Sequence, residues 1–226
     1  MTEKRETYTP KSTISSQNIS SVLHYKVLNQ AQLDLLPLLK NFKRSFYMVG
    51  GTAIALQIGH RRSIDFDLFT ERTIRSKNIL DSFSAEKLTT LVTRRVEEQL
   101  NLIVNGVKFT FFQYPFPVIA NQNIEGYMNM PDLLQLGAMK AYALGRRSKW
   151  KDYVDLFFIL KHSHSFEDIV EMANSIFGNL FSEKQFRAQL MYFEDVDFTE
   201  EIEYLHAHPS IDEIKESLKE ISLKIG

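Results

Sequence analysis

The sequence predicts an α/β (α+β) fold, with strands and helices in the first half of the chain and helices alone in the second. Three stretches support this prediction. In residues 64–68 apolar and acidic residues alternate, which is typical of a strand with one buried face. In residues 102–112 an Asn-Gly pair separates two apolar runs, which is the strongest short signal for a β-hairpin. From Pro131 onward the pattern is helical throughout.

We expect three segments along the chain. Residues 1–20 are polar and rich in Ser, Thr, Lys and Glu, so they are expected to form a flexible N-terminal arm. Residues 21–125 are expected to form the α/β core, and residues 126–226 a helical domain. The sequence contains no internal repeat and no low-complexity segment that would argue for another division.

Short patterns predict the elements of the core in chain order. Residues 21–43 carry apolar residues near helical spacing, with Pro37 at a break or at a second helix start. Residues 46–49 form an apolar run that ends at two glycines, which predicts a buried strand. Residues 52–58 predict a short helix that stops at Gly59.

Further helices are expected after the acid-bearing strand. Residues 84–99 predict a helix with Ser84 as its N-cap and one apolar face. Another helix is expected to have Pro131 at its first position and to end at Gly145, and the next to cover residues 150–160.

Composition limits the classes of function. The 226 residues carry a net charge of -1, which argues against a broad nucleic-acid-binding surface but allows a local basic patch. There are no cysteines, which excludes disulfides, thiolate metal sites and a cysteine nucleophile. No apolar run approaches the roughly 18 residues of a membrane span, and residues 1–21 lack an apolar signal segment. We therefore expect a cytoplasmic protein that does not contact membranes.

Two carboxylates on the predicted strand are the strongest candidates for chemistry. Asp65 and Asp67 lie two positions apart, so both are expected on one strand face while Ile64, Phe66 and Leu68 face the core. Neighbouring carboxylates repel each other unless a cation lies between them, and Mg²⁺ prefers oxygen ligands of this kind. We therefore expect a divalent metal here. The alternative for a bare pair of this kind is a solvated strand face.

A glycine pair precedes the short helix of residues 52–58. Gly50 and Gly51 lie where backbone N–H groups and the helix dipole favour an anion such as phosphate. A phosphate site beside a metal site indicates phosphoryl or nucleotidyl transfer, because metal ions clamp a transferring phosphate and neutralise the charge of the leaving group.

Two stretches of the sequence resemble a known family. The first is Gly-Gly-Thr-Ala at residues 50–53 followed by His-Arg-Arg-Ser-Ile-Asp-Phe-Asp-Leu-Phe at residues 60–69. It resembles the nucleotidyltransferase superfamily of DNA polymerase beta, and more closely its AbiEii-like branch, the toxins of abortive-infection toxin–antitoxin pairs. The second, at residues 139–147 and 151–156, resembles the lysine-bearing helix and the K-D-x-x-D-L helix of that branch. The resemblance covers residues 45–160 in outline.

The resemblance implies a fold, a reaction and partners. The fold is a nucleotidyltransferase core with a small mixed β-sheet, followed by a helical C-terminal domain. The reaction is the Mg²⁺- or Mn²⁺-dependent transfer of a nucleoside monophosphate from an NTP to an acceptor hydroxyl. The implied acceptor is RNA, with the 3′ end of a tRNA as the family-level expectation. The implied biological role is a growth-arresting toxin with a separately encoded antitoxin protein.

The resemblance also implies roles for individual residues. Gly50, Gly51 and Thr52 would hold the phosphates of the nucleotide. Asp65 and Asp67 would bind the divalent metal and carry the catalysis.

Four further residues are implied at the border of this site. Arg62 and Ser63 would touch phosphate, and Lys140 would reach the triphosphate. Asp152 would lie near the site as a base or as an organiser of Lys140. A lysine suits a triphosphate site because the triphosphate brings excess negative charge. The alternative for Lys140 is an ordinary solvated helix lysine.

Two features of the second stretch allow a structural interpretation as well. Asp155 lies in an apolar run, so we expect either a structural ion pair with Arg146 or Arg147 or a catalytic role. The basic residues 146–151 surround Trp150, which suits an RNA end held by phosphate contacts and stacking. The alternative is a charged interhelical loop with Trp150 as a buried anchor.

The strand expected at residues 107–112 departs from the superfamily. Members carry a third carboxylate there, whereas this chain has Lys108 and Thr110, followed by Gln113. A third acid often activates the attacking hydroxyl as a base. Either Asp152 or the substrate supplies that base, or the protein binds nucleotide or a partner without catalysis. A small-molecule (antibiotic) nucleotidyltransferase is a further alternative, which an acidic acceptor pocket would favour and a basic channel would not.

Overall fold

The computed structural model describes residues 23–206 and 208–224, so the arm expected at residues 1–20 lies outside the described residues. The first part of the chain forms these α-helices (α), 3-10 helices (η) and strands: η1 (Tyr25–Val27), α1 (Gln30–Leu35), η2 (Leu36–Asn41), β1 (Tyr47–Val49), α2 (Gly50–Ile58), β2 (Asp65–Thr70), α3 (Ser76–Ala85), β3 (Thr90–Arg95), β4 (Gln99–Val104), β5 (Val107–Gln113), β6 (Gln122–Ile124) and β7 (Met128–Met130).

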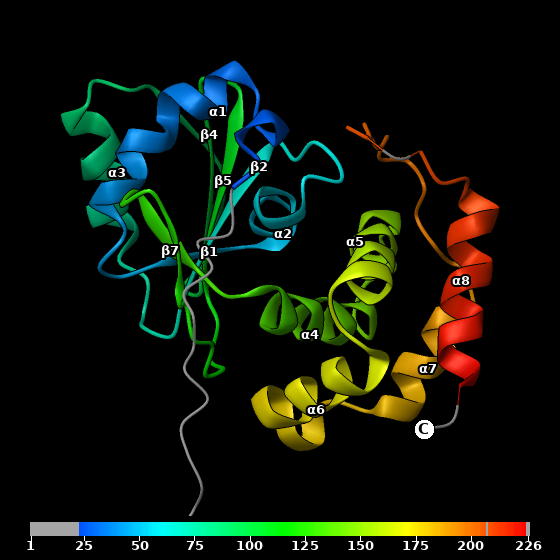
Figure 1. Cartoon of the computed structure of the whole chain (residues 1–226). Helices are drawn as coiled ribbons and strands as arrows, with labels where there is room; N and C mark the ends of the chain where they lie inside the picture. Colours follow the sequence, from blue (N-terminus) through cyan, green and yellow to red (C-terminus); the bar gives the residue numbers. More distant parts are fainter. Residues whose placement is uncertain (1–22, 207, 225–226) are drawn as a thin grey trace, which may run out of the picture.

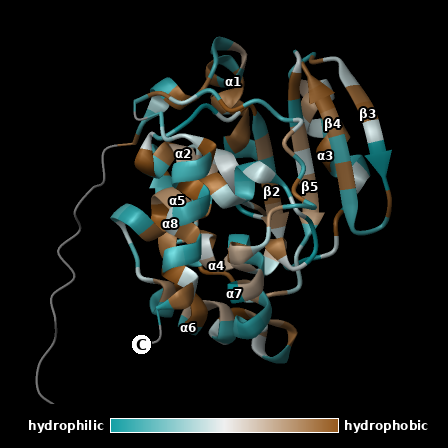
Figure 2. Cartoon of the chain, turned by 90° about the vertical axis from the view of Figure 1, so that its right-hand side faces the viewer, coloured by the Kyte–Doolittle hydropathy of each residue, from teal (hydrophilic) through white to brown (hydrophobic). Residues whose placement is uncertain are grey.

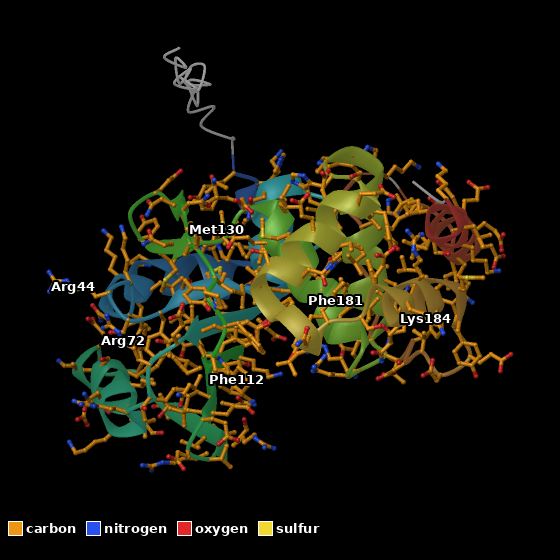
Figure 3. The ribbon with its side chains drawn as sticks, turned by 90° about the horizontal axis from the view of Figure 1, so that it is seen from below. Arg44, Arg72, Phe112, Met130, Phe181 and Lys184 are labelled. Carbon is orange, nitrogen blue, oxygen red and sulfur yellow. The ribbon has the colours of Figure 1, made fainter. Side chains whose placement is uncertain are left out.

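The remainder of the described chain is helical. It forms α4 (Leu133–Leu144), α5 (Trp150–His162), α6 (Phe166–Phe177), η3 (Gly178–Leu180), α7 (Glu183–Met191) and α8 (Ile211–Leu223). These helices gather beside and below the sheet, while α1 and α3 lie on the opposite side of it (Figure 1). Arg44 and Arg72 lie in the sheet part and Phe181 and Lys184 in the helical part (Figure 3). Within residues 23–206 and 208–224, no helix has the length and apolar character of a membrane span.

A five-stranded mixed sheet in the order β1-β2-β5-β4-β3 forms the centre of the fold. Strands β2 and β5 are parallel and the other neighbours are antiparallel. One row of paired residues crosses the sheet from Val49 through Asp67 and Thr110 to Asn101. The α/β fold with a small mixed sheet is therefore confirmed. The division of the chain near residue 125 stays a prediction. Strand β7 lies after that point, and the purely helical part begins with α4.

The two faces of the sheet differ in chemistry because side chains alternate along each strand. On one face, Phe66 and Phe109 are completely buried and lie with ring centroids 5.2 Å apart. Phe83 of α3 packs on them, 5.3 Å from Phe109. The opposite face carries Asp65 and Asp67. Contrary to the expectation from the alternating pattern, Ile64 lies before β2 and is 55% exposed.

The prediction of a helix at residues 84–99 is wrong. The chain ends α3 at Ala85, takes a positive φ of 56° at Lys87 and then forms β3 and β4. Residues 89–93 contain three Thr and one Val, whose β-branched side chains favour strands. Two of the residues expected on a buried helix face, Leu91 and Val92, lie instead on the edge strand β3 and are 61% and 40% exposed. This strand lies at the outer margin of the sheet (Figure 2).

Other local predictions are confirmed or shifted slightly. The short helix is α2, which starts at Gly50 and ends at Gly59 in the left-handed conformation, with a φ of 71°. The hairpin turn is confirmed, because Asn105 and Gly106 have positive φ values of 48° and 79°, as a type I′ turn requires. Helix α4 starts at Leu133 rather than at Pro131.

The shift in α4 has a capping cause. The side chain of Asp132 accepts a hydrogen bond from the backbone N–H of Gln135, so Asp132 is the N-cap and Pro131 precedes it. Helix α5 begins at Trp150 as expected and continues to His162. These two helices and strand β2 carry the charged side chains described next.

Candidate functional site

The carboxylates of β2 lie at the start of the strand, after a loop that is tied to α2. The hydroxyl of Thr52 lies 2.9 Å from the Ser63 hydroxyl and donates to the backbone carbonyl of Asp65. Asp65 and Asp67 project from the same face of β2 because they are two residues apart. Contacts of α2 therefore determine where the two carboxylates lie.

Two close contacts explain the glycine pair at the start of α2. Gly50 has a φ of +74°, and a Cβ added to it would lie 2.3 Å from Oδ2 of Asp67. A Cβ added to Gly51 would lie 2.3 Å from Nη2 of Arg61. Only glycine fits both positions without displacing a charged neighbour. The N-terminus of α2 is thereby held against the Asp67 carboxylate.

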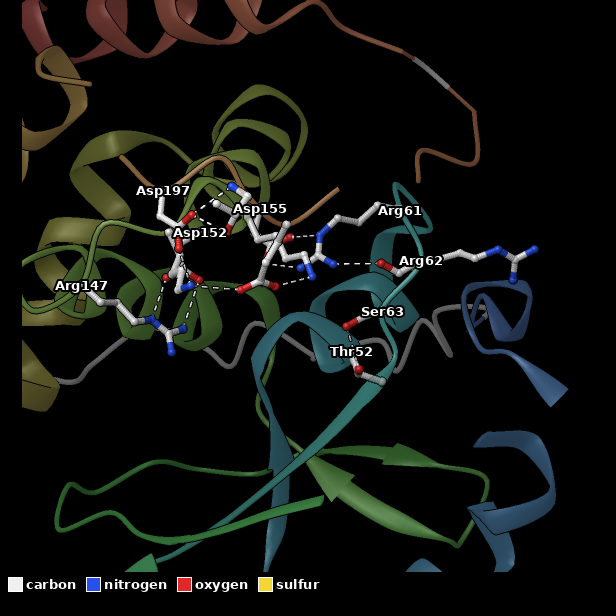
Figure 4. Close-up of polar contacts among 12 residues, drawn as sticks. Thr52, Arg61, Arg62, Ser63, Arg147, Asp152, Asp155 and Asp197 are labelled. Atoms are coloured by element: carbon white, nitrogen blue, oxygen red, sulfur yellow. Dashed lines mark hydrogen bonds and ion pairs between the residues drawn. The ribbon is translucent and has the colours of Figure 1, made fainter. Parts of the chain in front are cut away.

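A buried network of charges underlies this turn (Figure 4). The Arg61 side chain, 2% exposed, donates two hydrogen bonds to Asp155, with Nε–Oδ1 at 2.8 Å and Nη2–Oδ2 at 2.9 Å. His60 Nε2 lies 2.8 Å from the same Oδ1. Bidentate pairs of this kind combine strong attraction with a defined geometry. The network joins the loop before β2 to helix α5.

The network continues to helix α4 through Lys140. Its Nζ lies 2.6 Å from Oδ2 of Asp155 and 2.5 Å from Oδ1 of Asp152. The exposed Arg147 is the last member of the network, with its Nε 2.8 Å from Oδ2 of Asp152. Lys140 is therefore buried and doubly paired, contrary to the alternative of a solvated helix lysine.

The pKa values in this network follow from its charges. Burial by itself would raise the pKa of Asp155, but Arg61 and Lys140 outweigh burial and hold it well below its usual value. Burial would lower the pKa of Lys140, but Asp152 and Asp155 raise it above its usual value. Both groups are therefore charged at neutral pH, and the network is a permanent set of ion pairs.

The carboxylate pair of β2 has a different environment. Burial raises the pKa of Asp67, and the negative charge of Asp65 raises it further, whereas the Thr110 hydroxyl lowers it. Within the described residues, neither Asp65 nor Asp67 forms an ion pair with a basic side chain. The two carboxylates are thus left without a basic partner from the described chain.

A cavity of about 410 Å³ lies between this face of the sheet and α4. Gly50 and Asp67 line it on one side, and Lys140 lines it from α4. Strands β4 and β5 extend its wall with polar and aromatic side chains, among them Phe112, which lies in the sheet part of the molecule (Figure 3). One cavity therefore joins a helix N-terminus, a free carboxylate and an anchored lysine.

Comparison with known proteins agrees with this arrangement. Residues 38–127 match the family described as nucleotidyl transferase AbiEii toxin, type IV toxin–antitoxin system. An uncharacterised protein of Aquifex aeolicus (strain VF5) is 31% identical over 183 residues, which span 77% of this chain and 84% of the relative. The chain belongs to the AbiEii nucleotidyltransferase toxin family. The predicted family and the predicted enzyme class, a nucleotidyltransferase, are confirmed.

Solved structures share the fold of this chain. A Helicobacter pylori protein described as a candidate nucleotidyltransferase superposes with a TM-score of 0.57 at 16% identity, covering 86% of this chain and 94% of that one. MenT4, a nucleotidyltransferase toxin of Mycobacterium tuberculosis H37Rv, superposes with a TM-score of 0.56 at 14% identity, covering 85% and 80%. At these identities the likeness concerns the fold.

The structure does not bring every expected AbiEii site residue together. The Arg62 guanidinium points away from the network (Figure 4), with Nε 2.6 Å from Glu203 and Nη1 3.1 Å from the carbonyl of Lys26. Ser63 contacts Thr52 rather than the cavity. Gly50, Asp67 and Lys140 do line one cavity, and Asp152 lies directly behind Lys140.

The expected partners of Asp155 need correction. Asp155 is a structural ion-pair residue, as one of the two interpretations held, but its partners are Arg61, Lys140 and His60 rather than Arg146 or Arg147. No role for Arg61 was predicted from the sequence. Two features of the sequence could have indicated a role for Arg61. Gly51 lacks a side chain, which allows another side chain to approach it closely, and Asp155 lies in an apolar run, where a buried acid needs a basic partner.

The basic residues after α4 are mostly engaged by the protein itself. Lys149 Nζ lies 2.5 Å from Asp197, and Lys151 Nζ lies 2.6 Å from Glu200. Trp150 is buried and only 5% exposed. These contacts favour a charged interhelical loop with a buried anchor over an RNA-binding loop.

Proposed function

We propose that this AbiEii-family chain is a metal-dependent nucleotidyltransferase that moves a nucleoside monophosphate from an NTP to an acceptor hydroxyl on RNA. One observation carries the proposal. Asp67, which forms no ion pair in the described chain, lines a single cavity together with Gly50 of the α2 N-terminus and Lys140, and Asp65 lies two residues before it on the same strand face. Free negative charge beside two anion-binding elements suits a cation and a polyphosphate together.

The residues present fit a divalent metal. Asp65 and Asp67 offer carboxylate oxygens on one strand face, which are the ligands Mg²⁺ and Mn²⁺ prefer. Mg²⁺ is often held by one or two carboxylates plus substrate phosphates, so a pair is sufficient. No cluster of three His, Cys, Asp or Glu residues suited to a metal occurs among residues 23–206 and 208–224, which agrees with a two-carboxylate site. When bound, such a metal stabilises negative charge on the transferring phosphate.

The chain's own groups would position the triphosphate. The backbone N–H groups of Gly50, Gly51 and Thr52 open α2 and favour an anion. Lys140 keeps one N–H donor beyond those directed at Asp152 and Asp155, and its side chain lines the cavity. Asp152 accordingly acts as the organiser of Lys140.

Asp152 is poorly suited to the other role considered for it, that of a base. Burial alone would raise its pKa, but Lys140 and Arg147 outweigh burial and lower it. In the proposed step the acceptor oxygen bonds to the α-phosphorus and the bond from that phosphorus to pyrophosphate breaks. The hydroxyl proton is taken up by the substrate's own phosphate oxygens, because Asp152 is already paired.

The charge of the cavity favours an anionic acceptor. Four basic side chains line it, Lys108, Lys140, Arg146 and Arg147, against one acid, Asp67. A polycationic antibiotic would require an acidic acceptor pocket, so RNA, such as a tRNA 3′ end, is the better match. The corresponding biological role is a growth-arresting toxin restrained by an antitoxin protein.

A second candidate function is nucleotide binding without catalysis. The observation that favours it is the register of β5, which places Lys108 opposite Asp65 and Thr110 opposite Asp67. No carboxylate from β5 therefore joins the pair. This candidate predicts NTP binding without release of pyrophosphate.

Incorporation of α-³²P-labelled NTPs into total cellular RNA tests the proposal. Wild type, Asp67→Ala and the exposed control Asp81→Ala are compared with Mg²⁺ and with EDTA. We expect labelled RNA from wild type and Asp81→Ala with Mg²⁺ only. Label that persists in Asp67→Ala would refute the proposed site, and NTP binding without label from any nucleotide would support the non-catalytic candidate. Growth arrest on expression of wild type but not Asp67→Ala would test the toxin role.

A further inference from the structure

One row of paired residues crosses the sheet and defines the order in which side chains line the cavity. Gly50 follows Val49 on β1, and Val49 pairs with Asp67 on β2. On the other side of Asp67 the row continues to Thr110 on β5 and Asn101 on β4. Adjacent strands lie about 4.8 Å apart, so Asn101 lies about 10 Å from Asp67 along this row.

Phosphoryl transfer imposes an order on this row. The attacking oxygen and the leaving oxygen lie on opposite sides of the phosphorus, roughly in line. With the leaving pyrophosphate at Gly50 and the phosphorus at Asp67, the attacking hydroxyl has to arrive from the side of Thr110. The acceptor molecule then lies over β5 and β4.

Strands β4 and β5 present an unusual set of side chains there. Gln99 pairs with Phe112 and Asn101 with Thr110, so these four share one face. The amides of Gln99 and Asn101 contact each other, with Nε2 to Oδ1 at 2.9 Å. Each amide has both donors and an acceptor, so this contact leaves one amide oxygen and several N–H donors of the pair available. That combination matches the hydrogen-bonding edge of a nucleobase.

An aromatic surface and a positive charge accompany the amide pair. Phe112 is half-buried, lines the cavity and lies 5.2 Å, centroid to centroid, from Phe69. Lys108, on the same face of β5, is exposed and forms no ion pair within the described part of the chain. Stacking on an aromatic ring and contact of a phosphate with lysine are the usual means of holding single-stranded nucleic acid.

We propose that the face of β4 and β5 holds the 3′-terminal nucleotide of a nucleic-acid acceptor. The amide pair Gln99–Asn101 contacts the edge of the terminal base, Phe112 stacks on it, and Lys108 contacts the phosphate behind it. This inference rests on the proposed function, because the direction of the row depends on the NTP phosphates lying at Gly50. It makes Gln99 and Asn101 the residues that select the acceptor end.

Binding of short single-stranded RNAs that differ only in the 3′-terminal base tests this directly. The full chain is titrated against 5′-fluorescein oligoribonucleotides without NTP, and anisotropy is measured. Wild type should prefer one terminal base, and Asn101→Leu should reduce that preference about tenfold, the scale of one good base-edge contact. Gln99→Met gives an independent second variant. Asn129→Leu is the matched control, because Asn129 pairs with the amide of Asn123 on β6–β7, outside the cavity.

Two further variants separate the other contacts. Phe112→Leu should weaken all four RNAs by a similar factor, about tenfold, because stacking does not depend on base identity. Lys108→Ala should lower the slope of log affinity against log salt by about 0.7, the value for one phosphate contact on a single strand. Lys184→Ala, an exposed lysine on α7, should leave that slope unchanged.

Two results would overturn the inference. They are a wild type that does not discriminate among terminal bases, and an unchanged preference in both Asn101→Leu and Gln99→Met. The proposed function fails differently, through absence of Mg²⁺-dependent labelling by wild type, which is measured in a separate reaction. The RNA-binding result stands apart from that outcome because it is obtained without NTP.

Discussion

Two pairs of aspartates in this molecule have opposite surroundings. Asp152 and Asp155 on α5 are buried and paired with Arg61, Lys140 and the exposed Arg147. The pair on β2 has no basic partner in the described chain. The aspartates of α5 thus stabilise the structure around the site, whereas those of β2 keep negative charge available for a ligand.

The difference separates stability from activity. Removing one member of a buried ion pair leaves its partner charged and desolvated, which is costly. Removing one of two like charges that repel each other relieves a cost. We therefore expect substitutions on α5 to destabilise the fold and substitutions on β2 to abolish transfer while leaving the fold intact.

The largest effect on stability is expected for Asp155→Asn. The change leaves Arg61 and Lys140 without their shared partner in the interior, so the free energy of unfolding should fall by about 3–5 kcal/mol. Urea unfolding followed by circular dichroism measures this. The exposed variant Asp81→Asn should unfold close to wild type, and a comparably small effect for Asp155→Asn would show that the network is not structural.

The largest effect on activity alone is expected for Asp67→Asn. Nucleotide transfer should fall by more than about 100-fold, since even an outer partner of a metal ligand is worth about 10–100-fold. The urea midpoint should stay the same or rise, because a repulsion with Asp65 is removed. Loss of activity together with loss of folded structure would contradict the proposed division of roles.

Lys140 belongs to both regions, so Lys140→Met should give an intermediate result. Asp152 and Asp155 keep Arg147 and Arg61, so the loss of stability should be smaller than for Asp155→Asn. Binding of a non-hydrolysable NTP should weaken about tenfold, the scale of one charged hydrogen bond. Calorimetric titration measures it. Unchanged NTP affinity would show that Lys140 serves the network alone.

The acid dependence of stability provides the smallest and most specific test. The pKa of Asp155 is depressed in the fold, so its contribution is present above its unfolded pKa of about 3.9 and is lost as pH falls through the folded pKa. Wild type should therefore lose stability below about pH 4, and Asp155→Asn should lose less over the same range. An equally steep acid slope in the variant would assign the effect to other carboxyl groups.

Local patterns predicted the parts of the site that lie within one short stretch. The glycine pair, the helix after it and the acids of β2 were all found because each depends on neighbours within about four residues. The same local reasoning failed at residues 84–99, where apolar spacing suited a helix but the β-branched residues formed the edge strand β3.

Pairings between residues far apart in the chain could not be predicted from the sequence. Arg61 and Asp155 are 94 positions apart, and only the folded chain shows that they meet. The wrong partners expected for Asp155 were those nearest in sequence, Arg146 and Arg147. The resemblance to the superfamily predicted that Lys108 and Thr110 lie beside the β2 acids, whereas the contact between the amides of Gln99 and Asn101 was not predicted.

Binding of Mn²⁺ followed by electron paramagnetic resonance tests whether the β2 carboxylates are open to a cation. Wild type should bind Mn²⁺ in the presence of a non-hydrolysable NTP, and Asp67→Asn should not. The exposed variant Asp168→Asn, on α6, should bind as wild type does. Equal Mn²⁺ binding by Asp67→Asn and wild type would contradict the account, because the metal would then lie elsewhere.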